Sequence, residues 1–150
     1  MYTQEQLQCR EKSVWTKLMS TLAPLQFIAF VVSFYLVIRF LISGEGYLAA
    51  TISIWIKIGL LWAMTVAGML WEKEMYGHYF MCKEFFWEDL GNLIAMLTHN
   101  AYFIVKWLGW GQKEIMLVMC FAYITYLFNF GQFTVRWAKS RRQRHQICNT

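Results

Sequence analysis

A cluster of carboxylates between two hydrophobic segments is the part of this sequence best suited to chemistry. Five of the nine acidic residues gather there, namely Glu72, Glu74, Glu84, Glu88 and Asp89. Aromatic residues lie beside them in the runs Trp71-Glu72-Lys73-Glu74 and Phe85-Phe86-Trp87-Glu88-Asp89. Carboxyl groups among aromatic rings at a membrane edge are costly to maintain, and their proton affinities are readily shifted. The cluster suggests proton transfer to a hydrophobic substrate, although a solvated loop beside an interfacial aromatic belt would have the same composition.

The composition is that of a membrane protein, which restricts the elements that can position the cluster. Of the 150 residues, 58% are hydrophobic and 15% are charged. Four apolar stretches are long enough for a helix to cross the hydrocarbon core, which takes roughly 20 residues; they cover residues 18–42, 47–71, 85–109 and 115–137. Gly44-Glu45-Gly46 and Gly109-Trp110-Gly111 supply turns that fold each pair into a hairpin. The predicted fold class is all-α, a single integral membrane domain over residues 1–150 forming an up-down four-helix bundle.

The distribution of Lys and Arg predicts how this bundle is oriented. Ten of these residues lie on the side of the two termini and the middle connection, and three lie on the opposite side, Arg39, Lys106 and Lys113. Because positive residues accumulate on the cytoplasmic side, both termini and the carboxylate cluster are expected in the cytoplasm. The first span follows polar residues without a good cleavage site, so it is expected to remain as an anchor. The predicted localisation is the cytoplasmic (inner) membrane, multi-pass, with the active face cytoplasmic.

The net charge of +5 and the four cysteines exclude other classes of function. The positive excess concentrates in the tail 139–150, directly after a predicted span, so contact with anionic lipid explains it better than nucleic acid does. The cysteines lack Cys-x-x-C and Cys/His spacing. We therefore predict neither disulfides nor a protein-bound metal, and expect membrane lipid rather than nucleic acid as a partner.

Lys57 and His99 are the polar side chains nearest the predicted membrane midplane. Each lies about 15 Å along its helix from the nearer end, where a charge costs about 2.5 to 3.5 kcal/mol on insertion scales. Asn92 and His99 follow Glu88 at helical spacing, so a polar stripe leads inward from the cluster. A second stripe consists of Asn129, Gln132 and Arg136. Hydrogen bonds that hold helices together explain these residues as well as a ligand or proton-relay role does.

Four blocks of residues, in this order, resemble the bacteriochlorophyllide 3-vinyl hydratase family of photosynthetic bacteria. The resemblance covers most of the chain and is most specific from Met1 to about Tyr102. The blocks are Met1-Tyr2-Thr3 with Glu5-Gln6, Trp15-Thr16 and Leu22-Ala23-Pro24-Leu25-Gln26-Phe27; Gly44-Glu45-Gly46-Tyr47 with Ala50-Thr51 and Lys57; Gly68 with Trp71-Glu72-Lys73 and Gly77; and Phe85-Phe86-Trp87-Glu88-Asp89 with His99 and Tyr102. A looser resemblance continues through Tyr123, Tyr126, Asn129, Gln132 and Phe133.

The resemblance implies a hydro-lyase of bacteriochlorophyll biosynthesis. It would add water across the 3-vinyl group of a bacteriochlorophyllide-type tetrapyrrole and give the 3-(1-hydroxyethyl) pigment. Protonation of the terminal vinyl carbon leaves a cation that the conjugated ring stabilises, and water then attacks it. This step needs one protonated acid and one base. It needs no cofactor, because hydration transfers no electrons and magnesium is carried by the substrate. Association with other pigment-biosynthesis enzymes is a further expectation, and the oligomeric state stays open.

Within this chemistry the sequence favours Glu72 and Glu88 as the acid/base pair. They end one predicted helix and begin the next, so they can converge. Asp89 either orients one of them by hydrogen bonding or replaces it. The sequence does not assign acid and base between the two, but burial and mutual repulsion separate the proton affinities of paired carboxyls.

The remaining expected contacts concern the pigment itself. His99 is expected either as an axial ligand to the substrate magnesium or as a proton relay, and Lys57 as a partner of a propionate. The other expected substrate-binding residues are Trp71, Phe86, Trp87 and Asn92. Two alternatives stay open from the sequence. One is a non-catalytic chlorophyll-binding or pigment-assembly protein, and the other is a bundle that binds quinone or lipid.

Overall fold

The computed structural model describes residues 4–148, without the side chains of Gln4, Leu7 and residues 143–148. This range contains five helices, α1 (Gln4–Lys12), α2 (Val14–Ser43), α3 (Tyr47–Tyr76), α4 (Phe86–Trp107) and α5 (Gln112–Cys148), and no strand. The all-α class is therefore confirmed. Three features used in the sequence analysis lie outside the described residues: the Met1-Tyr2-Thr3 block and the side chains of Arg144 and Cys148.

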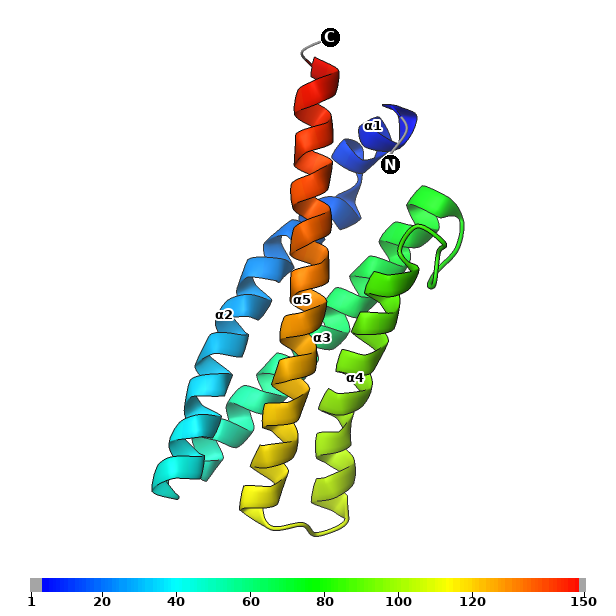
Figure 1. Cartoon of the computed structure of the whole chain (residues 1–150). Coiled ribbons are helices and arrows are strands. Elements are labelled where there is room, and N and C mark those ends of the chain that lie inside the picture. The colour runs from blue at the N-terminus through cyan, green and yellow to red at the C-terminus, as the bar shows by residue number, and fades with distance from the viewer. Residues whose placement is uncertain (1–3, 149–150) are drawn as a thin grey trace.

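The four long helices form two hairpins that cross each other (Figure 1). α2 packs along α3, and α4 packs along α5. Contacts between the hairpins are sparser and run from α2 to α5 and from α3 to α4. We call the end with α1, the α3–α4 connection and the C-terminal part of α5 the α1 end, and the end with the two glycine turns the turn end. The two hairpins therefore pack against each other less closely than the two helices within each hairpin do.

Helix α2 begins earlier than predicted because Ser13 caps it. Ser13 is extended at its backbone, and its hydroxyl accepts a hydrogen bond from the Thr16 N–H at 3.4 Å. This side chain satisfies one of the free N–H groups at the helix start. At the other end Gly44 has a φ of 74°, and its N–H donates to the Phe40 carbonyl at 2.7 Å. The predicted glycine turn after residue 42 is confirmed.

Helices α3 and α5 extend past the predicted ends of their spans. α3 continues beyond Trp71 to Tyr76 and stops at Gly77, whose φ of 78° lies in the left-handed region that glycine adopts readily. Glu72 and Glu74 are therefore helical rather than part of a loop. α5 continues to Cys148, so the basic tail prolongs a helix as far as the structure describes it. Because Glu72 is part of α3, the packing of this helix determines where the Glu72 side chain lies.

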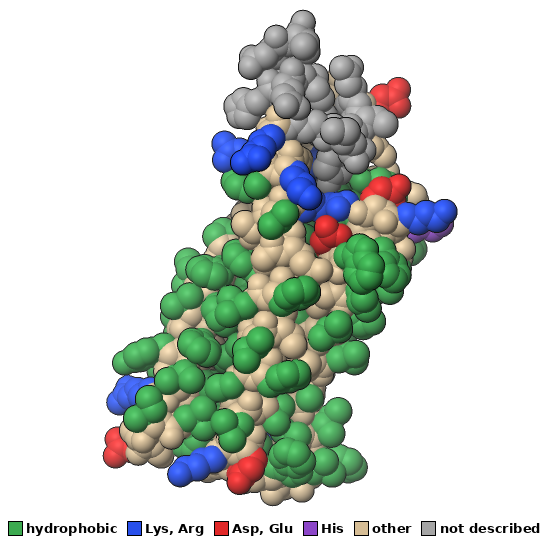
Figure 2. Space-filling model, viewed as in Figure 1, with side chains coloured by type: hydrophobic (Ala, Val, Ile, Leu, Met, Phe, Trp, Pro, Cys, Tyr) green, Lys and Arg blue, Asp and Glu red, His purple; other side chains and the backbone are tan. Residues whose placement is uncertain are grey.

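Three helices are long and apolar enough to cross a membrane, judged by length and composition. They are α2, α3 and the part of α5 from Gln112 to Arg142. α4 is not one of them, although a span was predicted over residues 85–109, because Asn92, His99 and Asn100 lower its mean hydropathy. Hydrophobic side chains cover much of the visible face, and Lys and Arg gather toward the α1 end (Figure 2). The visible face is consistent with helices that could span a membrane.

The space between the hairpins is filled toward the turn end. Val37, Ala50, Ile54, Met116 and Met119 are fully buried there. A short network of hydroxyl groups joins this core, in which the Ser33 hydroxyl lies 2.9 Å from Ser53 and 2.5 Å from Tyr123. We call this region the closed half.

Candidate active site

A cavity of about 620 Å³ lies between the hairpins on the α1 side. Its volume falls within the range of roughly 300 to 1,000 Å³ found for small-molecule sites. Its walls are mostly apolar and include Met19, Met64, Met69, Phe130, Phe133 and Trp137. Polar side chains interrupt these walls, and Glu72, Asp89, Asn92 and Asn129 are among them. An apolar cleft with a few polar groups suits a hydrophobic ligand that needs orientation.

Glu72 and Asp89 meet at this cavity from α3 and α4. Each is only 4% exposed, and their carboxyl groups are close enough to share a hydrogen bond. The Cys82 thiol, from the connection between the helices, lies near Glu72 and donates to the His78 carbonyl at 3.8 Å. Burial, together with the neighbouring carboxyl groups, raises the pKa of the Cys82 thiol to about 12. The thiol therefore stays protonated near neutral pH and adds no negative charge beside the carboxyl pair.

The two carboxyl groups have different hydrogen-bond environments. Asp89 Oδ2 accepts a hydrogen bond from the Met81 backbone N–H at 2.7 Å. Met81 adopts a φ of 59°, which is uncommon for a residue other than glycine, so the loop holds a strained conformation where it meets Asp89. The Oε2 atom of Glu72 is buried and has no hydrogen-bond partner among the described residues. The surroundings of Asp89 thus favour a charged group more than those of Glu72 do.

Glu88 does not join this pair, because it faces α5. Its carboxylate lies 3.1 Å from Arg136 Nη1, and Arg136 also donates to the Glu84 carbonyl and covers the Phe85 ring at 3.6 Å. Successive residues on a helix point about 100° apart, so Glu88 and Asp89 address different neighbours. The structure brings Glu72 together with Asp89 and places Glu88 apart, outside the cavity lining. Asp89, rather than Glu88, is therefore the α4 carboxyl group that lies beside Glu72, which fits the expectation that Asp89 could replace one member of the predicted pair.

Of the aromatic and amide residues expected to contact the pigment, two line the cavity and two do not. Trp71 and Asn92 line the cavity. Trp71 Nε1 donates to Thr16 Oγ1 at 2.9 Å, and Asn92 Nδ2 donates to Thr65 Oγ1 at 3.2 Å, so both are held in place. Phe86 and Trp87 are 41% and 68% exposed and do not contribute to the lining. These two rings lie on the outer surface.

Lys57 and His99 lie deeper, behind Tyr126. Both are fully buried, and Lys57 Nζ sits 3.4 Å from the centre of the Tyr126 ring. The His99 Nδ1 atom lies 2.7 Å from the Ala95 carbonyl, which can only accept, so Nδ1 carries the hydrogen. Its Nε2 and the Lys57 Nζ have no hydrogen-bond partner among the described residues. Tyr126 lines the cavity but Lys57 and His99 do not, so their contacts with the pigment stay predictions.

The fourth long helix supplies residues that the sequence did not assign to the site. Tyr126, Phe130, Phe133 and Trp137 all line the cavity from α5. Their spacing of four, three and four residues puts them on one helical face, which is the pattern that identifies them in retrospect. Gly91 lets α4 approach α5 closely, because a Cβ there would collide with Gln132 Oε1. Cys82 had no sequence pattern that pointed to the carboxyl pair.

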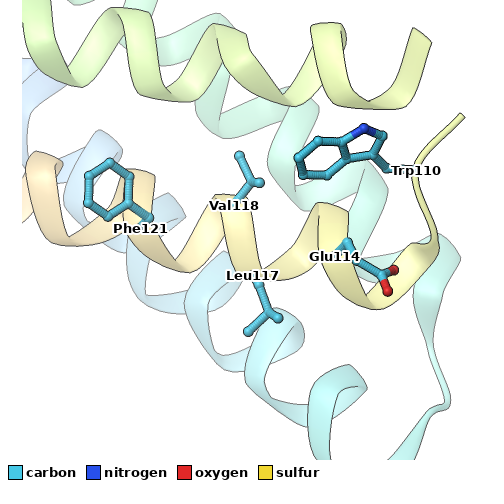
Figure 3. Close-up of a pocket in the computed structure, with 5 residues that line it drawn as sticks. All are labelled: Trp110, Glu114, Leu117, Val118 and Phe121. Carbon is cyan, nitrogen blue, oxygen red and sulfur yellow. The ribbon is translucent and has the colours of Figure 1, made fainter. Parts of the chain in front are cut away.

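A second hollow, of about 400 Å³, lies at the turn end. Figure 3 shows its five lining residues, with the Glu114 carboxylate directed away from the Trp110 ring. The other three are Leu117, Val118 and Phe121. The lining of this hollow contains one carboxyl group, Glu114, and no second acid or base, whereas the lining of the cavity on the α1 side contains both Glu72 and Asp89. The cavity on the α1 side is therefore the candidate active site.

Comparison with known proteins places the chain in a family. The model of the family described as 2-vinyl bacteriochlorophyllide hydratase (BCHF) matches residues 2–139. The chain belongs to this family. A 2-vinyl bacteriochlorophyllide hydratase of Rhodobacter capsulatus is 43% identical over 143 residues, covering 95% of this chain and 84% of the relative. One of Cereibacter sphaeroides is 42% identical over 133 residues, covering 89% and 83%. No solved structure matches.

Membership in the 2-vinyl bacteriochlorophyllide hydratase family confirms the resemblance drawn from the sequence blocks. The family name numbers the vinyl carbon by the older scheme for the macrocycle, whose position 2 is position 3 of the current scheme. The range matched by the hydratase family contains Glu72, Asp89 and Cys82, and every cavity-lining residue except Ser140. The geometry described above thus lies within the part of the chain that defines the hydratase family.

Proposed function

We propose that this chain is a hydratase that adds water across the 3-vinyl group of a bacteriochlorophyllide during bacteriochlorophyll biosynthesis. One observation carries the proposal: the chain belongs to a hydratase family, and its buried Glu72–Asp89 pair opens onto an apolar cavity. Vinyl hydration needs a proton donor and a proton acceptor at one hydrophobic site. Glu72 and Asp89 are proposed to serve as this donor and acceptor.

The macrocycle is proposed to lie between the apolar walls from the two hairpins. Phe130 and Phe133 approach from α5, and Met19 and Met64 from α2 and α3. Methionine side chains are flexible and adapt to an irregular ligand. The vinyl group would face Glu72 and Asp89, and Asn92 and Asn129 would hold the attacking water. Both amides line the cavity, and Asn129 Oδ1 has no hydrogen-bond partner among the described residues.

We assign Glu72 as the acid and Asp89 as the base. Two buried carboxyl groups in contact repel each other when both are charged, so sharing one proton is favoured. The Met81 N–H donates to Asp89 and supports its negative charge, whereas Glu72 Oε2 has no described donor. The proton of the pair therefore belongs on Glu72.

The proposed reaction proceeds in two proton transfers. Glu72 gives its proton to the terminal vinyl carbon, and the resulting cation at the inner carbon is stabilised by conjugation with the ring. Water attacks that carbon and passes its extra proton to Asp89. The direct contact of the two carboxyl groups then allows the proton to return to Glu72. One water is consumed, no electron is transferred, and no cofactor of the protein is required.

We further propose that α4 crosses the membrane with the other three long helices as a four-helix bundle. α5 packs along α4, and Gln132 and Arg136 bond to its first turn, which covers part of its polar surface. The excess of Lys and Arg at the α1 end supports both termini and the cavity on the cytoplasmic side of the inner membrane. This orientation would expose the active face to the compartment in which the pigment is made.

Isotopically labelled water tests the function directly. Membranes that contain the full chain are incubated with 3-vinyl bacteriochlorophyllide in ¹⁸O-water, and the product is analysed by mass spectrometry. The expected result is a 3-(1-hydroxyethyl) pigment that carries one ¹⁸O atom. Pigment that is retained by the protein but gains no label would instead identify a non-catalytic pigment-binding protein.

A further inference from the structure

Arg136 on α5 makes three contacts at the start of α4 and also lines the cavity. Its Nη1 atom lies 3.1 Å from the Glu88 carboxylate, and its Nη2 atom donates to the Glu84 carbonyl. The guanidinium carbon lies 3.6 Å from the centre of the Phe85 ring. The Nε atom is buried and has no hydrogen-bond partner among the described residues, although Arg136 belongs to the cavity lining. Glu88 therefore uses one nitrogen of the guanidinium, over which the positive charge is delocalised.

This positive charge lies near the carboxyl pair of Glu72 and Asp89. Asp89 follows Glu88 directly on α4, lines the same cavity as Arg136 and interacts with it electrostatically. The interactions described for Glu72 involve Asp89 and Cys82 and do not include Arg136. A positive charge favours the ionised form of a neighbouring carboxyl group, and it acts more strongly where water is scarce. The surroundings on α5 therefore favour a negative charge on Asp89 rather than on Glu72.

We propose that Arg136 is a positioning residue that holds Asp89 ionised, so that Asp89 accepts the proton of the attacking water while Glu72 keeps the proton for the vinyl group. This inference rests on the proposed function, because it concerns the division of acid and base within that reaction. The ion pair with Glu88 holds the guanidinium in place. Arg136 thus acts through Asp89, and Glu88, which the sequence favoured as one of the reacting carboxyl groups, acts through Arg136.

Other charged or titratable groups surround Asp89 and its neighbours. They are Glu72 of α3, Cys82 and Glu84 of the α3–α4 connection, Glu88 of α4 and Arg10 of α1. The residues of α2 that line the cavity are uncharged, namely Thr16, Met19, Ser20, Ala23 and Gln26. Glu88 opposes the effect of Arg136 on Asp89, because it carries the same sign of charge as Asp89. Arg136 is the cation for which an electrostatic interaction with Asp89 is described.

The two members of this ion pair make opposite predictions for the pH dependence of hydration. Arg136→Gln removes a positive charge near Asp89, so a higher pH is needed before the base is ionised. Glu88→Gln removes a negative charge, so a lower pH suffices. Both variants break the same contact between α4 and α5. Shifts of opposite sign therefore separate an effect of charge on Asp89 from the loss of a structural contact.

The test measures kcat for vinyl hydration against pH in membranes with the wild-type chain, Arg136→Gln, Arg136→Lys and Glu88→Gln. In Arg136→Gln the acidic limb of the profile should move to higher pH by about one pH unit. In Glu88→Gln it should move to lower pH by about half a pH unit. Arg136→Lys should retain most of the wild-type profile because it keeps the charge.

Lys139→Gln is the matched control, since Lys139 is an exposed cation on α5 that does not line the cavity. It should keep the wild-type profile. An unchanged profile in Arg136→Gln, shifts of the same sign in Arg136→Gln and Glu88→Gln, or an equal shift in Lys139→Gln would overturn the inference. If Arg136→Gln does not accumulate in membranes, an unshifted profile in Glu88→Gln would overturn it instead. Hydration by the wild type without these shifts refutes only the role of Arg136, whereas no hydration at any pH refutes the proposed function and this inference with it.

Discussion

The two halves of the space between the hairpins differ in how completely side chains fill it, whereas buried polar atoms without described partners occur in both halves. In the closed half, the hydroxyl groups of Ser33, Ser53 and Tyr123 bond to one another within a filled core. On the α1 side the helices leave a cavity of about 620 Å³, and Glu72 Oε2 and Asn129 Oδ1 remain without described partners. Buried polar atoms are normally satisfied, and exceptions call for an explanation. The difference in filling indicates that the closed half stabilises the fold and that the cavity on the α1 side can bind a ligand.

The largest expected effect comes from removing the proton of the carboxyl pair. Glu72→Gln keeps the size of the side chain but cannot transfer a proton, so kcat for vinyl hydration should fall by about 10³. Glu114→Gln at the hollow of the turn end is the control and should retain wild-type turnover. Rates are measured by the appearance of the hydroxyethyl pigment in membranes with matched protein amounts. Equal loss in both variants would remove the distinction between the two hollows.

A second pair of variants distinguishes the two neighbours on α4. Asp89→Asn should lower kcat by about 10² because it removes the proposed base. Glu88→Gln weakens the contact with Arg136 but leaves the pair intact, so its kcat should stay within about 10-fold of wild type. Pigment binding is measured in parallel to show that each variant retains its cavity. A larger loss of kcat in Glu88→Gln would restore the Glu72–Glu88 pairing that the sequence favoured.

Filling the cavity should weaken pigment binding without affecting the closed half. Gly68 lines the cavity, and a Cβ there would meet only Met19 Cε, at 4.0 Å, so Gly68→Leu projects into open space. The Kd for the pigment should rise about 10-fold. Gly59→Leu is the matched control, because Gly59 lies on the exposed face of the same helix with nothing within 4 Å. Tight binding by Gly68→Leu would place the pigment elsewhere.

The smallest expected effect belongs to the closed half. Tyr123→Phe removes the hydrogen bond to Ser33 and should lower the free energy of unfolding by about 1 kcal/mol, while turnover of the remaining folded protein stays at the wild-type level. Tyr35→Phe is the control, since Tyr35 is 64% exposed on α2. Thermal unfolding in detergent is compared with turnover in membranes. A large loss of turnover with unchanged stability would show that this region takes part in the reaction.

Helical spacing predicted most of the helices and their turns, but fewer of the residues that form the candidate active site. The hairpin turns at Gly44 and Gly109 were predicted because glycine adopts left-handed backbone angles readily. Glu72, which belongs to the predicted carboxylate cluster, is buried and lines the cavity, and its catalytic role stays a prediction. The cluster did not distinguish Glu88 from Asp89 as the partner, because adjacent residues on a helix face different neighbours and the sequence does not state which neighbour lies where. Cys82 and the α5 wall were missed for the same reason.

By itself the sequence determined the class of the protein, its hairpin turns, its family and the region in which acid chemistry is concentrated. Composition and periodicity suffice for the class and the turns, because these depend on local backbone preference and on the length of each apolar stretch. The family follows instead from the resemblance of the four residue blocks. Only the tertiary structure decided that Glu72 lies beside Asp89, that Arg136 forms an ion pair with Glu88, and that Lys57 and His99 lie behind Tyr126. These contacts depend on the rotation and separation of whole helices, which packing between the hairpins sets.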